Sequence, residues 1–156
     1  MSHIPGTLLV VNRCGILLRG AAGTGKSDTA VRLLRDGHQL VADDAVDVDV
    51  SAGQLIGRAP RQGLGLLCLR GLGVIDVHRH FGPGAIAAGT AIDRVIELTP
   101  EPRPSDPQGD WAMIRISGIP IPSLRLAPER PLAALVALIA SEAQGMNASM
   151  DATPCD

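Results

Sequence analysis

Aromatic side chains are almost absent from this chain of 156 residues, which has one phenylalanine, Phe81, one tryptophan, Trp111, and no tyrosine. Single-stranded nucleic acids are bound largely by bases that stack on exposed rings, and few rings are available here. The formal net charge is -2 with histidine neutral, and no cluster of lysines and arginines offers a footprint for a phosphate backbone. We therefore expect no nucleic-acid partner and a core built from aliphatic side chains.

Cysteine is equally scarce. The three cysteines, Cys14, Cys68 and Cys155, are odd in number and far apart, and none forms a Cys-x-x-Cys pair. Neither a disulfide framework nor a thiolate zinc site is indicated by this spacing. A chain of this length can bury an adequate core without disulfides. A reducing compartment fits this cysteine usage.

Long hydrophobic runs are missing as well. The longest, Pro131–Ala140, falls well short of the ~20 apolar residues that a membrane-spanning helix needs. The first five residues contain no basic segment, and the apolar run Leu8–Val11 is too short for the core of a secretory signal. We therefore expect no membrane association and a cytoplasmic protein.

Short β-rich runs alternate with glycine-rich turns and two helical segments, which predicts one α/β domain over residues 1–143. A helix is expected from Lys26 to Asp36, with Gly37 as its stop, and another over residues 131–143. The tail, residues 144–156, is expected to be disordered. Strands are predicted at residues 7–11, 15–18, 39–42, 46–50, 54–57, 64–69 (buried), 74–77, 91–98 and 112–116, and an exposed loop at residues 100–110.

A complete P-loop motif, G-x-x-x-x-G-K-[ST], follows the second predicted strand. It consists of Gly20, Ala21, Ala22, Gly23, Thr24, Gly25, Lys26 and Ser27. Its glycines let several backbone N–H groups point at one phosphate, and the helix that follows adds its positive dipole end. Lys26 is expected to reach the β- and γ-phosphates, and the Ser27 hydroxyl to bind Mg²⁺. The alternative is a chance glycine-rich turn, which the Lys-Ser pair and the strand–loop–helix context disfavour.

Two adjacent carboxylates, Asp43 and Asp44, end the apolar run Leu40–Ala42. Ligands of α/β sheets bind at the carboxyl ends of strands, so we expect these acids near the phosphates. One acid commonly acts on Mg²⁺ in such enzymes, and a second suggests a general base toward an attacking hydroxyl. The alternative is an exposed turn, where aspartate is common.

Four segments together resemble the HPr kinase/phosphorylase family: Gly20–Ser27, Gly37–Asp44, Leu69–Val77 and Phe81–Ile86. The last two are far more specific than the P-loop, which many families share. The resemblance extends from about His3 to Leu138. It is to the short members of alphaproteobacterial type, which lack the family's usual N-terminal domain.

The resemblance implies a fold and a reaction. The fold is the family's α/β P-loop kinase domain with a mixed sheet, which is similar to phosphoenolpyruvate carboxykinase. The reaction is the phosphorylation of a serine on HPr or an HPr-like phosphocarrier by ATP with Mg²⁺, and the family also carries out the reverse phosphorolysis. Many members are hexamers, so a homo-oligomer is expected.

The resemblance also implies roles for individual residues. Asp43 falls on the family's proton acceptor, Lys26 on its P-loop lysine, and Ser27 on a ligand of Mg²⁺. The resemblance assigns no role to Asp44, which is expected to be the acid of the pair that acts on Mg²⁺ with Ser27, as one acid commonly does in such enzymes. His3 falls near the family's catalytic histidine, which precedes the first hairpin.

The remaining candidates are an arginine of the family's signature segment and positions at which this chain departs from the family's pattern. Arg70 belongs to the family's signature segment and is expected to offer its guanidinium to a phosphate. Arg103 is the candidate for a catalytic arginine in a mobile loop that is shortened here. Cys68 stands where the family has a metal-ligating glutamate. The alternative is that Cys68 points into the core and Asp76 serves the metal. The phosphorolysis region is matched only weakly, around Arg125–Arg130, so kinase activity is better supported than its reverse.

Two further functions remain open at this point. The first is a small-molecule P-loop kinase, which would need an arginine-rich lid that only residues 100–110 could supply. The second is a nucleotide-sensing module with little catalysis, for which Cys68 is the main support.

Overall fold

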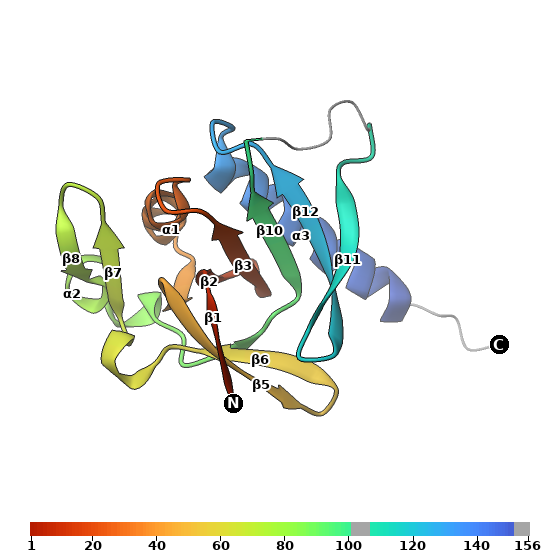
Figure 1. Ribbon diagram of the computed structural model, residues 1–156, viewed down its shortest axis with the longest axis horizontal. Helices are drawn as coiled ribbons and strands as arrows, with labels where there is room; N and C mark the ends of the chain where they lie inside the picture. Colours follow the sequence, from red (N-terminus) through yellow and green to blue (C-terminus); the bar gives the residue numbers. More distant parts are fainter. Residues whose placement is uncertain (101–106, 152–156) are drawn as a thin grey trace.

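A six-stranded mixed sheet forms the centre of the molecule. The structure is a computed structural model that describes residues 1–100 and 107–151, with side chains as far as residue 143. The strand order of the sheet is β11-β12-β10-β3-β2-β4 (Figure 1). The three strands β3, β10 and β12 are parallel, and the other pairings are antiparallel. The strands are Thr7–Val11 (β2), Cys14–Gly20 (β3), Gln39–Ala42 (β4), Arg94–Leu98 (β10), Trp111–Ile116 (β11) and Ile119–Leu126 (β12).

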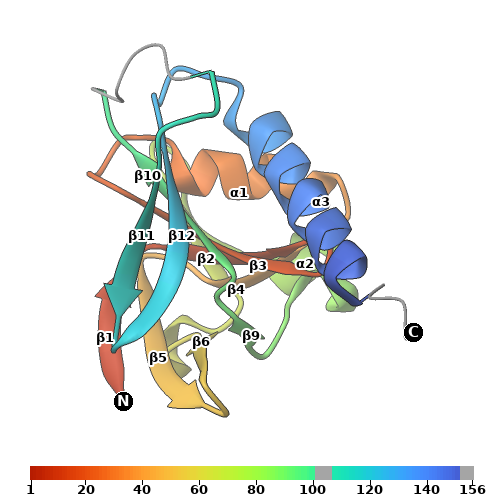
Figure 2. The ribbon, with the colours of Figure 1, turned by 90° about the vertical axis from the view of Figure 1, so that its right-hand side faces the viewer.

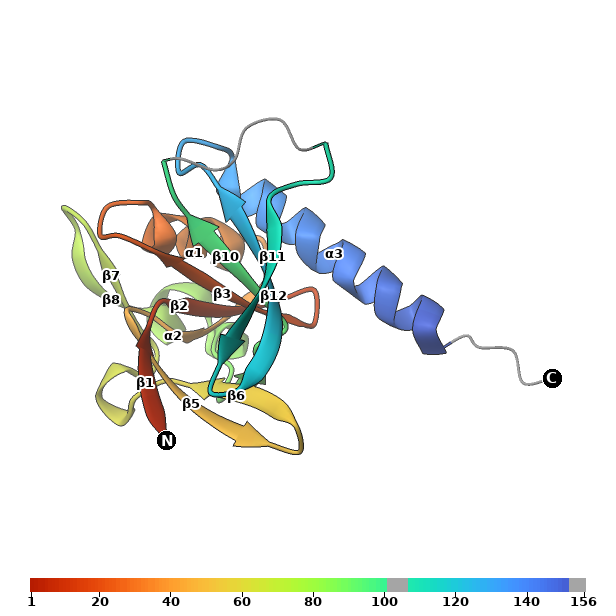
Figure 3. The ribbon, with the colours of Figure 1, turned by 45° about the vertical axis from the view of Figure 1, so that its right-hand side comes forward.

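Two helices cover one face of this sheet: α1 (Lys26–Arg35) and α3 (Leu132–Asp151) (Figure 2). Alternation along the strands places Leu9, Ile16 and Leu18 in the same buried cluster as the inner residues of both helices. The long helix α3 crosses behind the sheet and extends past its edge (Figure 3). No helix in the described part of the chain is long and apolar enough to cross a membrane.

An antiparallel four-stranded sheet covers the other face. Its order is β1-β5-β6-β9, formed by Ser2–Pro5 (β1), Ala45–Ser51 (β5), Gln54–Arg58 (β6) and Thr90–Ala91 (β9). The second core cluster lies between the two sheets, where Leu8 and Leu17 meet Val46, Val48 and Leu55. The central sheet is therefore buried on both faces, in agreement with the aliphatic core expected from the sequence.

A separate hairpin stands beside α1 (Figure 1). It consists of Leu66–Leu69 (β7) and Gly73–Asp76 (β8), and the short helix Val77–Phe81 (α2) follows it. Two 3₁₀ turns, Arg61–Gly63 and Pro83–Ala85, flank this region. The prediction of a buried strand at residues 64–69 was wrong in part, because Leu66 and Cys68 face outward while Leu67 and Leu69 are buried.

Other elements depart from the sequence-based expectation. The strands β1 and β12 were not predicted, and β12 contains Pro120 and Pro122, which argue against a strand because proline has no N–H to donate. This half of β12 pairs only with β11, while β10 joins it from Ser123 onward. The helix α3 runs to Asp151, beyond the expected end at residue 143, and residues 152–156 of the expected disordered tail lie outside the described residues.

Candidate active site

The directions of three strands bring the site together. Because β2 is antiparallel to both β3 and β4, the latter two run in the same direction. Their last residues, Gly20 and Ala42, therefore lie at the same edge of the sheet, and Thr7, the first residue of β2, lies between them. The glycine-rich loop (Gly20–Ser27) and the two acids that follow β4 thus meet, as the sequence predicts.

The glycine-rich loop presents free donors where α1 begins. Gly25 occupies the N-cap position with φ +93°, a conformation that favours glycine, and no side chain caps the helix. The first N–H groups of α1 are therefore available to an anion. The Lys26 ammonium donates to the carbonyl oxygens of Gly20 at 2.7 Å and Ala21 at 3.1 Å, so it lies folded over the loop.

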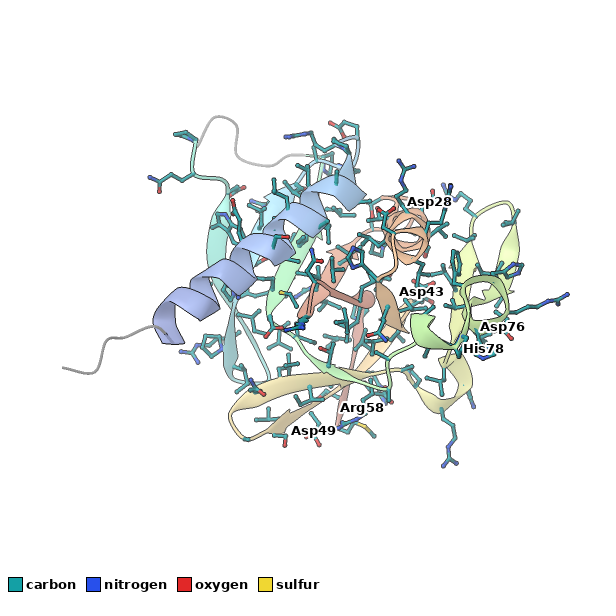
Figure 4. All side chains as sticks on the ribbon, turned by 180° about the vertical axis from the view of Figure 1, so that it is seen from behind. Asp28, Asp43, Asp49, Arg58, Asp76 and His78 are labelled. Carbon is teal, nitrogen blue, oxygen red and sulfur yellow. The ribbon has the colours of Figure 1, made fainter. Side chains whose placement is uncertain are left out.

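The Asp43 carboxylate is the centre of the hydrogen-bonding network. The Ser27 hydroxyl donates to it, with Oγ 3.1 Å from Oδ1 and 3.2 Å from Oδ2. The Thr7 hydroxyl donates to Oδ1 at 2.8 Å, and the Cys68 backbone N–H donates to Oδ2 at 3.0 Å. Three elements, β2, α1 and β7, therefore fix one carboxylate. Figure 4 shows Asp43 inside the molecule, and Asp76 and His78 farther out by α2.

Asp44 differs from its neighbour. Its φ of +69° is unusual for a residue other than glycine, and the turn exposes its side chain. Gly6 N–H donates to its carbonyl oxygen at 3.1 Å, which ties this turn to the β1–β2 connection. Among the described residues, its carboxylate has no hydrogen-bond or ion-pair partner. The two acids thus offer one fixed and one uncommitted carboxylate.

These groups line a cavity of about 350 Å³, which we call the phosphate cavity. Arg70 lies over the loop, because a side-chain carbon at Gly23 would come within 3.1 Å of its Nη1. The Cys68 side chain is exposed and lines the same cavity, so the alternative placement in the core was wrong. The lining residues are Ala22, Gly23, Gly25, Lys26, Ser27, Asp28, Asp43, Asp44, Cys68 and Arg70.

The donor set suits a hard cation. In the described part of the chain, no group of three or more His, Cys, Asp or Glu side chains could hold a metal ion on its own. Mg²⁺ needs less, because it keeps several waters and is usually held by one or two carboxylates together with phosphates. Ser27, Asp43 and Asp44 supply such oxygen atoms. Asp76 does not, since it caps α2 by accepting from Arg79 N–H at 3.2 Å.

Two of the predicted residues are not placed at the cavity. His3 pairs with Asp47 across β1 and β5, its side chain is 70% exposed, and it does not line the cavity. The expectation for Arg103 falls outside the described residues. Conversely, sequence reasoning missed Thr7, which the structure shows to be fully buried. Its only signal in the sequence is that it is a polar residue at the start of an apolar strand.

Comparison with known proteins identifies what the chain is similar to. The model of the HPr serine kinase C-terminal domain matches residues 1–154. A protein of Clostridium botulinum (strain Eklund 17B / Type B) named HPr kinase/phosphorylase is 38% identical over 133 residues, which are 83% of this chain and 43% of that protein. One of Lactobacillus delbrueckii subsp. bulgaricus with the same name is 46% identical over 99 residues, 63% of this chain and 31% of that protein.

A solved structure extends the similarity to the whole fold. The structure of the Hpr(Ser) kinase/phosphatase from Coxiella burnetii matches with a TM-score of 0.90 and 30% identity, over 98% of this chain and 96% of that one. The chain spans less than half the length of the two relatives described above.

Proposed function

Because the chain belongs to the family of the HPr serine kinase C-terminal domain, we propose that it transfers the γ-phosphate of ATP to a serine on HPr or an HPr-like phosphocarrier. The reaction would take place in the cytoplasm. A homo-oligomer, such as the hexamer expected from the resemblance, is part of the same proposal, as is a fold related to phosphoenolpyruvate carboxykinase.

One observation carries this proposal: the hydrogen bonds between Ser27 and Asp43 inside the phosphate cavity. They join the end of the glycine-rich loop to the end of β4, so a phosphate-binding element and a fixed carboxylate share one cavity. Phosphoryl transfer depends mainly on positioning and on electrostatic stabilisation of the transferring group. This arrangement provides both.

The loop acts as a P-loop in this proposal. The N–H groups at the start of α1 bind the phosphate oxygens, and the Lys26 ammonium moves from the carbonyls of Gly20 and Ala21 to the β- and γ-phosphates. Both carbonyls belong to the loop itself, so only the side chain has to move. The Arg70 guanidinium, which lies over Gly23, adds a second positive charge at the loop.

The acids take different roles. Asp43 accepts the proton of the serine hydroxyl, and the three groups that donate hydrogen bonds to it hold the accepting oxygens in place. Ser27 and Asp44 would hold Mg²⁺, which when bound neutralises charge on the phosphate oxygens. The contact between Ser27 and Asp43 also favours a second arrangement, in which Asp43 belongs to the metal site and Asp44, with its uncommitted carboxylate, is the base.

The remaining parts of the proposal rest on the resemblance. His3 and Arg103 stay predictions, and no step is assigned to them. The phosphorolysis would use the same cavity, with inorganic phosphate bound by the loop and attacking the phosphoserine, so that the serine hydroxyl is released and pyrophosphate is formed. Cys68, which stands where the resemblance places a glutamate, lines the cavity that both reactions would use.

The test is direct. The purified protein is incubated with γ-labelled ATP and Mg²⁺, with HPr, with HPr in which the acceptor serine is alanine, or with free serine. We expect label on HPr, and none on the alanine variant or on free serine. Efficient labelling of small hydroxyl compounds would support a small-molecule kinase instead. Nucleotide binding without transfer to any acceptor would support a sensing module.

A further inference from the structure

The outer strand β11 is an open edge of the central sheet (Figure 1). It pairs with β12 on one side, and no strand of the described residues pairs with its other side. The opposite edge, β4, is covered instead, because Leu40 forms a bridge with Ile86 and its carbonyl accepts from the Ala87 N–H at 2.9 Å. The helix α3 packs mainly against α1, β2 and β3, so it does not close the β11 edge.

The prolines of β12 identify the backbone groups of β11 that face this neighbour. Pro122 lies opposite Met113, and Pro120 lies opposite Arg115. Hydrogen-bonded and non-hydrogen-bonded pairs alternate along an antiparallel ladder. Because proline has no N–H to donate, both of these pairs are of the non-hydrogen-bonded kind.

A hydrogen bond just before β11 agrees with this alternation. The Arg125 N–H donates to the Asp110 carbonyl oxygen at 3.1 Å, so the position before Trp111 is a hydrogen-bonded one. The N–H and C=O groups of Trp111, Met113 and Arg115 therefore point away from β12. Along the open edge they form a row of donors and acceptors with no partner strand in the described part of the chain.

The side chains of the same three residues share one face of the strand. Trp111 is 42% exposed and Met113 is 64% exposed. Arg115, which donates to the Gly118 carbonyl oxygen at 3.0 Å, is the only charged residue of β11. Native proteins usually block an open edge with prolines, several charges or a covering segment. The strand β11 has no proline and one charge, so its own sequence leaves it able to pair.

We propose that β11 pairs with β11 of a second copy of this chain, in an antiparallel ladder centred on Met113. The inference deepens the homo-oligomer of the proposed function by naming its surface, and it rests on that part of the proposed function alone. Two identical antiparallel strands are related by a two-fold axis, so the contact is closed and self-complementary. Met113 would lie opposite the partner's Met113, and Trp111 opposite the partner's Arg115. Each of these pairs exchanges two backbone hydrogen bonds.

The side chains favour this register over the alternatives that also join the free backbone groups. A ladder centred on Arg115 would place two guanidinium groups directly opposite each other, which is unfavourable. A ladder centred on Trp111 would leave most of the strand unpaired. Centring on Met113 uses the whole row and sets each guanidinium beside an indole ring, where a cation is attracted. On the other face, the small Ala112 would meet the larger Ile114 of the partner.

The rival occupant is a strand of another protein, above all of the phosphocarrier, which could extend the sheet in the same way. The pattern of β11 favours a second copy. Trp111 and Arg115 stand at equal distances on either side of Met113, so the strand itself supplies both members of each cation–ring pair. A different protein would have to supply a matching pattern.

The first experiment measures the assembly of the full chain by sedimentation equilibrium over a range of protein concentrations. Met113→Lys would bring two ammonium groups together at the two-fold axis. We expect the largest assembly to dissociate into smaller species, with the dissociation constant raised by about tenfold or more. The control is Val74→Lys, because Val74 is also 64% exposed but lies on the separate hairpin. Its assembly should be unchanged.

A second variant, Met113→Pro, removes the N–H that would donate at the axis. Its pair with Pro122 needs no donor, so β12 should remain in place, which circular dichroism would check. This variant should dissociate like Met113→Lys. If either folded variant assembles as the unmodified protein does, the inference is wrong.

The register is tested by disulfide formation in a background of Cys68→Ser and Cys155→Ser. Met113→Cys should form a cross-linked dimer under mild oxidation, because the two copies of residue 113 face each other. Arg115→Cys should not, since its two copies would lie about 13 Å apart along the ladder. Cross-linking of the second variant alone would overturn the proposed register.

The remaining outcomes separate this inference from the proposed function. Assembly that neither substitution at Met113 affects would place the homo-oligomer on another surface. A chain that is monomeric at every concentration would overturn the homo-oligomer and the inference together, while labelling of HPr by that monomer would leave the kinase function standing. Normal assembly of Met113→Lys with loss of transfer to HPr would assign the edge to the phosphocarrier instead.

Discussion

The Thr7 hydroxyl donates a hydrogen bond of 2.8 Å to Oδ1 of Asp43, from the start of β2 to the end of β4. Thr7 is fully buried, so its hydroxyl has no access to water as an alternative partner. The bond therefore ties the Asp43 carboxylate to β2, which is the strand between β3 and β4. Positioning of Asp43 therefore depends on a residue outside the glycine-rich loop.

Replacing Thr7 with valine keeps the shape of the side chain and removes the hydroxyl. One donor to the buried side of Asp43 is then lost, which should lower the free energy of unfolding by ~1–3 kcal/mol, as measured by urea denaturation. The rate of phosphate transfer should also fall, because the carboxylate is less well held. Thr7→Ser retains the hydroxyl and is the control. Equal behaviour of the valine and serine variants would show that the hydrogen bond contributes nothing.

Replacing Lys26 with alanine removes the ammonium but leaves the backbone N–H groups of the loop. Transfer should fall by orders of magnitude, since electrostatic stabilisation of a transferring phosphoryl group is worth ~3 kcal/mol or more. The control is Arg19→Ala, which removes a cation of β3 that pairs with Glu97 outside the phosphate cavity. The rate of HPr phosphorylation is the measurement. Near-normal turnover by Lys26→Ala would contradict the role given to the glycine-rich loop.

The roles of the two acids are separated by two asparagine variants. Asp43→Asn keeps the size of the side chain and removes its basicity, so transfer should fall by ~10²–10⁴ while nucleotide still binds. Asp44→Asn should mainly raise the Mg²⁺ concentration that half-maximal activity requires. Transfer rates across a Mg²⁺ titration distinguish the two effects. If the two variants behave the other way round, Asp44 is the base and Asp43 belongs to the metal site.

Much of the site could be predicted from the sequence because its elements are local. The loop, the helix α1 and the acids after β4 each follow from a contiguous pattern, and the family expected from the signature segments is confirmed. The mixed α/β class is confirmed as well. By contrast, Thr7 reaches Asp43 only through the pairing of β2 with β4, which no local pattern encodes.

There are also physical reasons why the sequence analysis missed β12 and was wrong in part about β7. Pro120 and Pro122 obscured β12, because a strand with two prolines is tolerated only where one side needs no N–H donors. The β7 strand looked buried because its leucines are frequent, yet it forms a two-stranded hairpin that has one open face. The placement of Cys68 at the cavity follows from that open face.

Cys68 offers a test of the metal site. Mg²⁺ prefers oxygen atoms, and a thiol is a poor ligand for it. Cys68→Glu would add a carboxylate to a side chain that already lines the phosphate cavity. Half-maximal activity should then shift to lower Mg²⁺, whereas Cys68→Gln, of the same size but neutral, should not produce the shift. An unchanged Mg²⁺ curve in the glutamate variant would place the metal away from this side chain.

The two described cysteines should differ sharply in their reaction with iodoacetamide. Burial, and next the negative charge of Asp93, raise the pKa of Cys14 to about 11 despite the opposing charge of Arg94. A thiol is an acid that reacts as its thiolate, so the raised pKa keeps Cys14 protonated until the pH approaches that value. At pH 8 only about a thousandth of it is thiolate, even before burial limits access.

Cys68 is exposed and lines the phosphate cavity, so it should be modified first, as read by mass spectrometry in a Cys155→Ser background. ADP with Mg²⁺ should slow its modification, because ligand in the cavity covers the thiol. Cys14 should react only after unfolding by urea. Rapid modification of Cys14 in the folded protein would contradict its burial, and modification of Cys68 that is insensitive to nucleotide would place the bound phosphates away from this wall of the cavity.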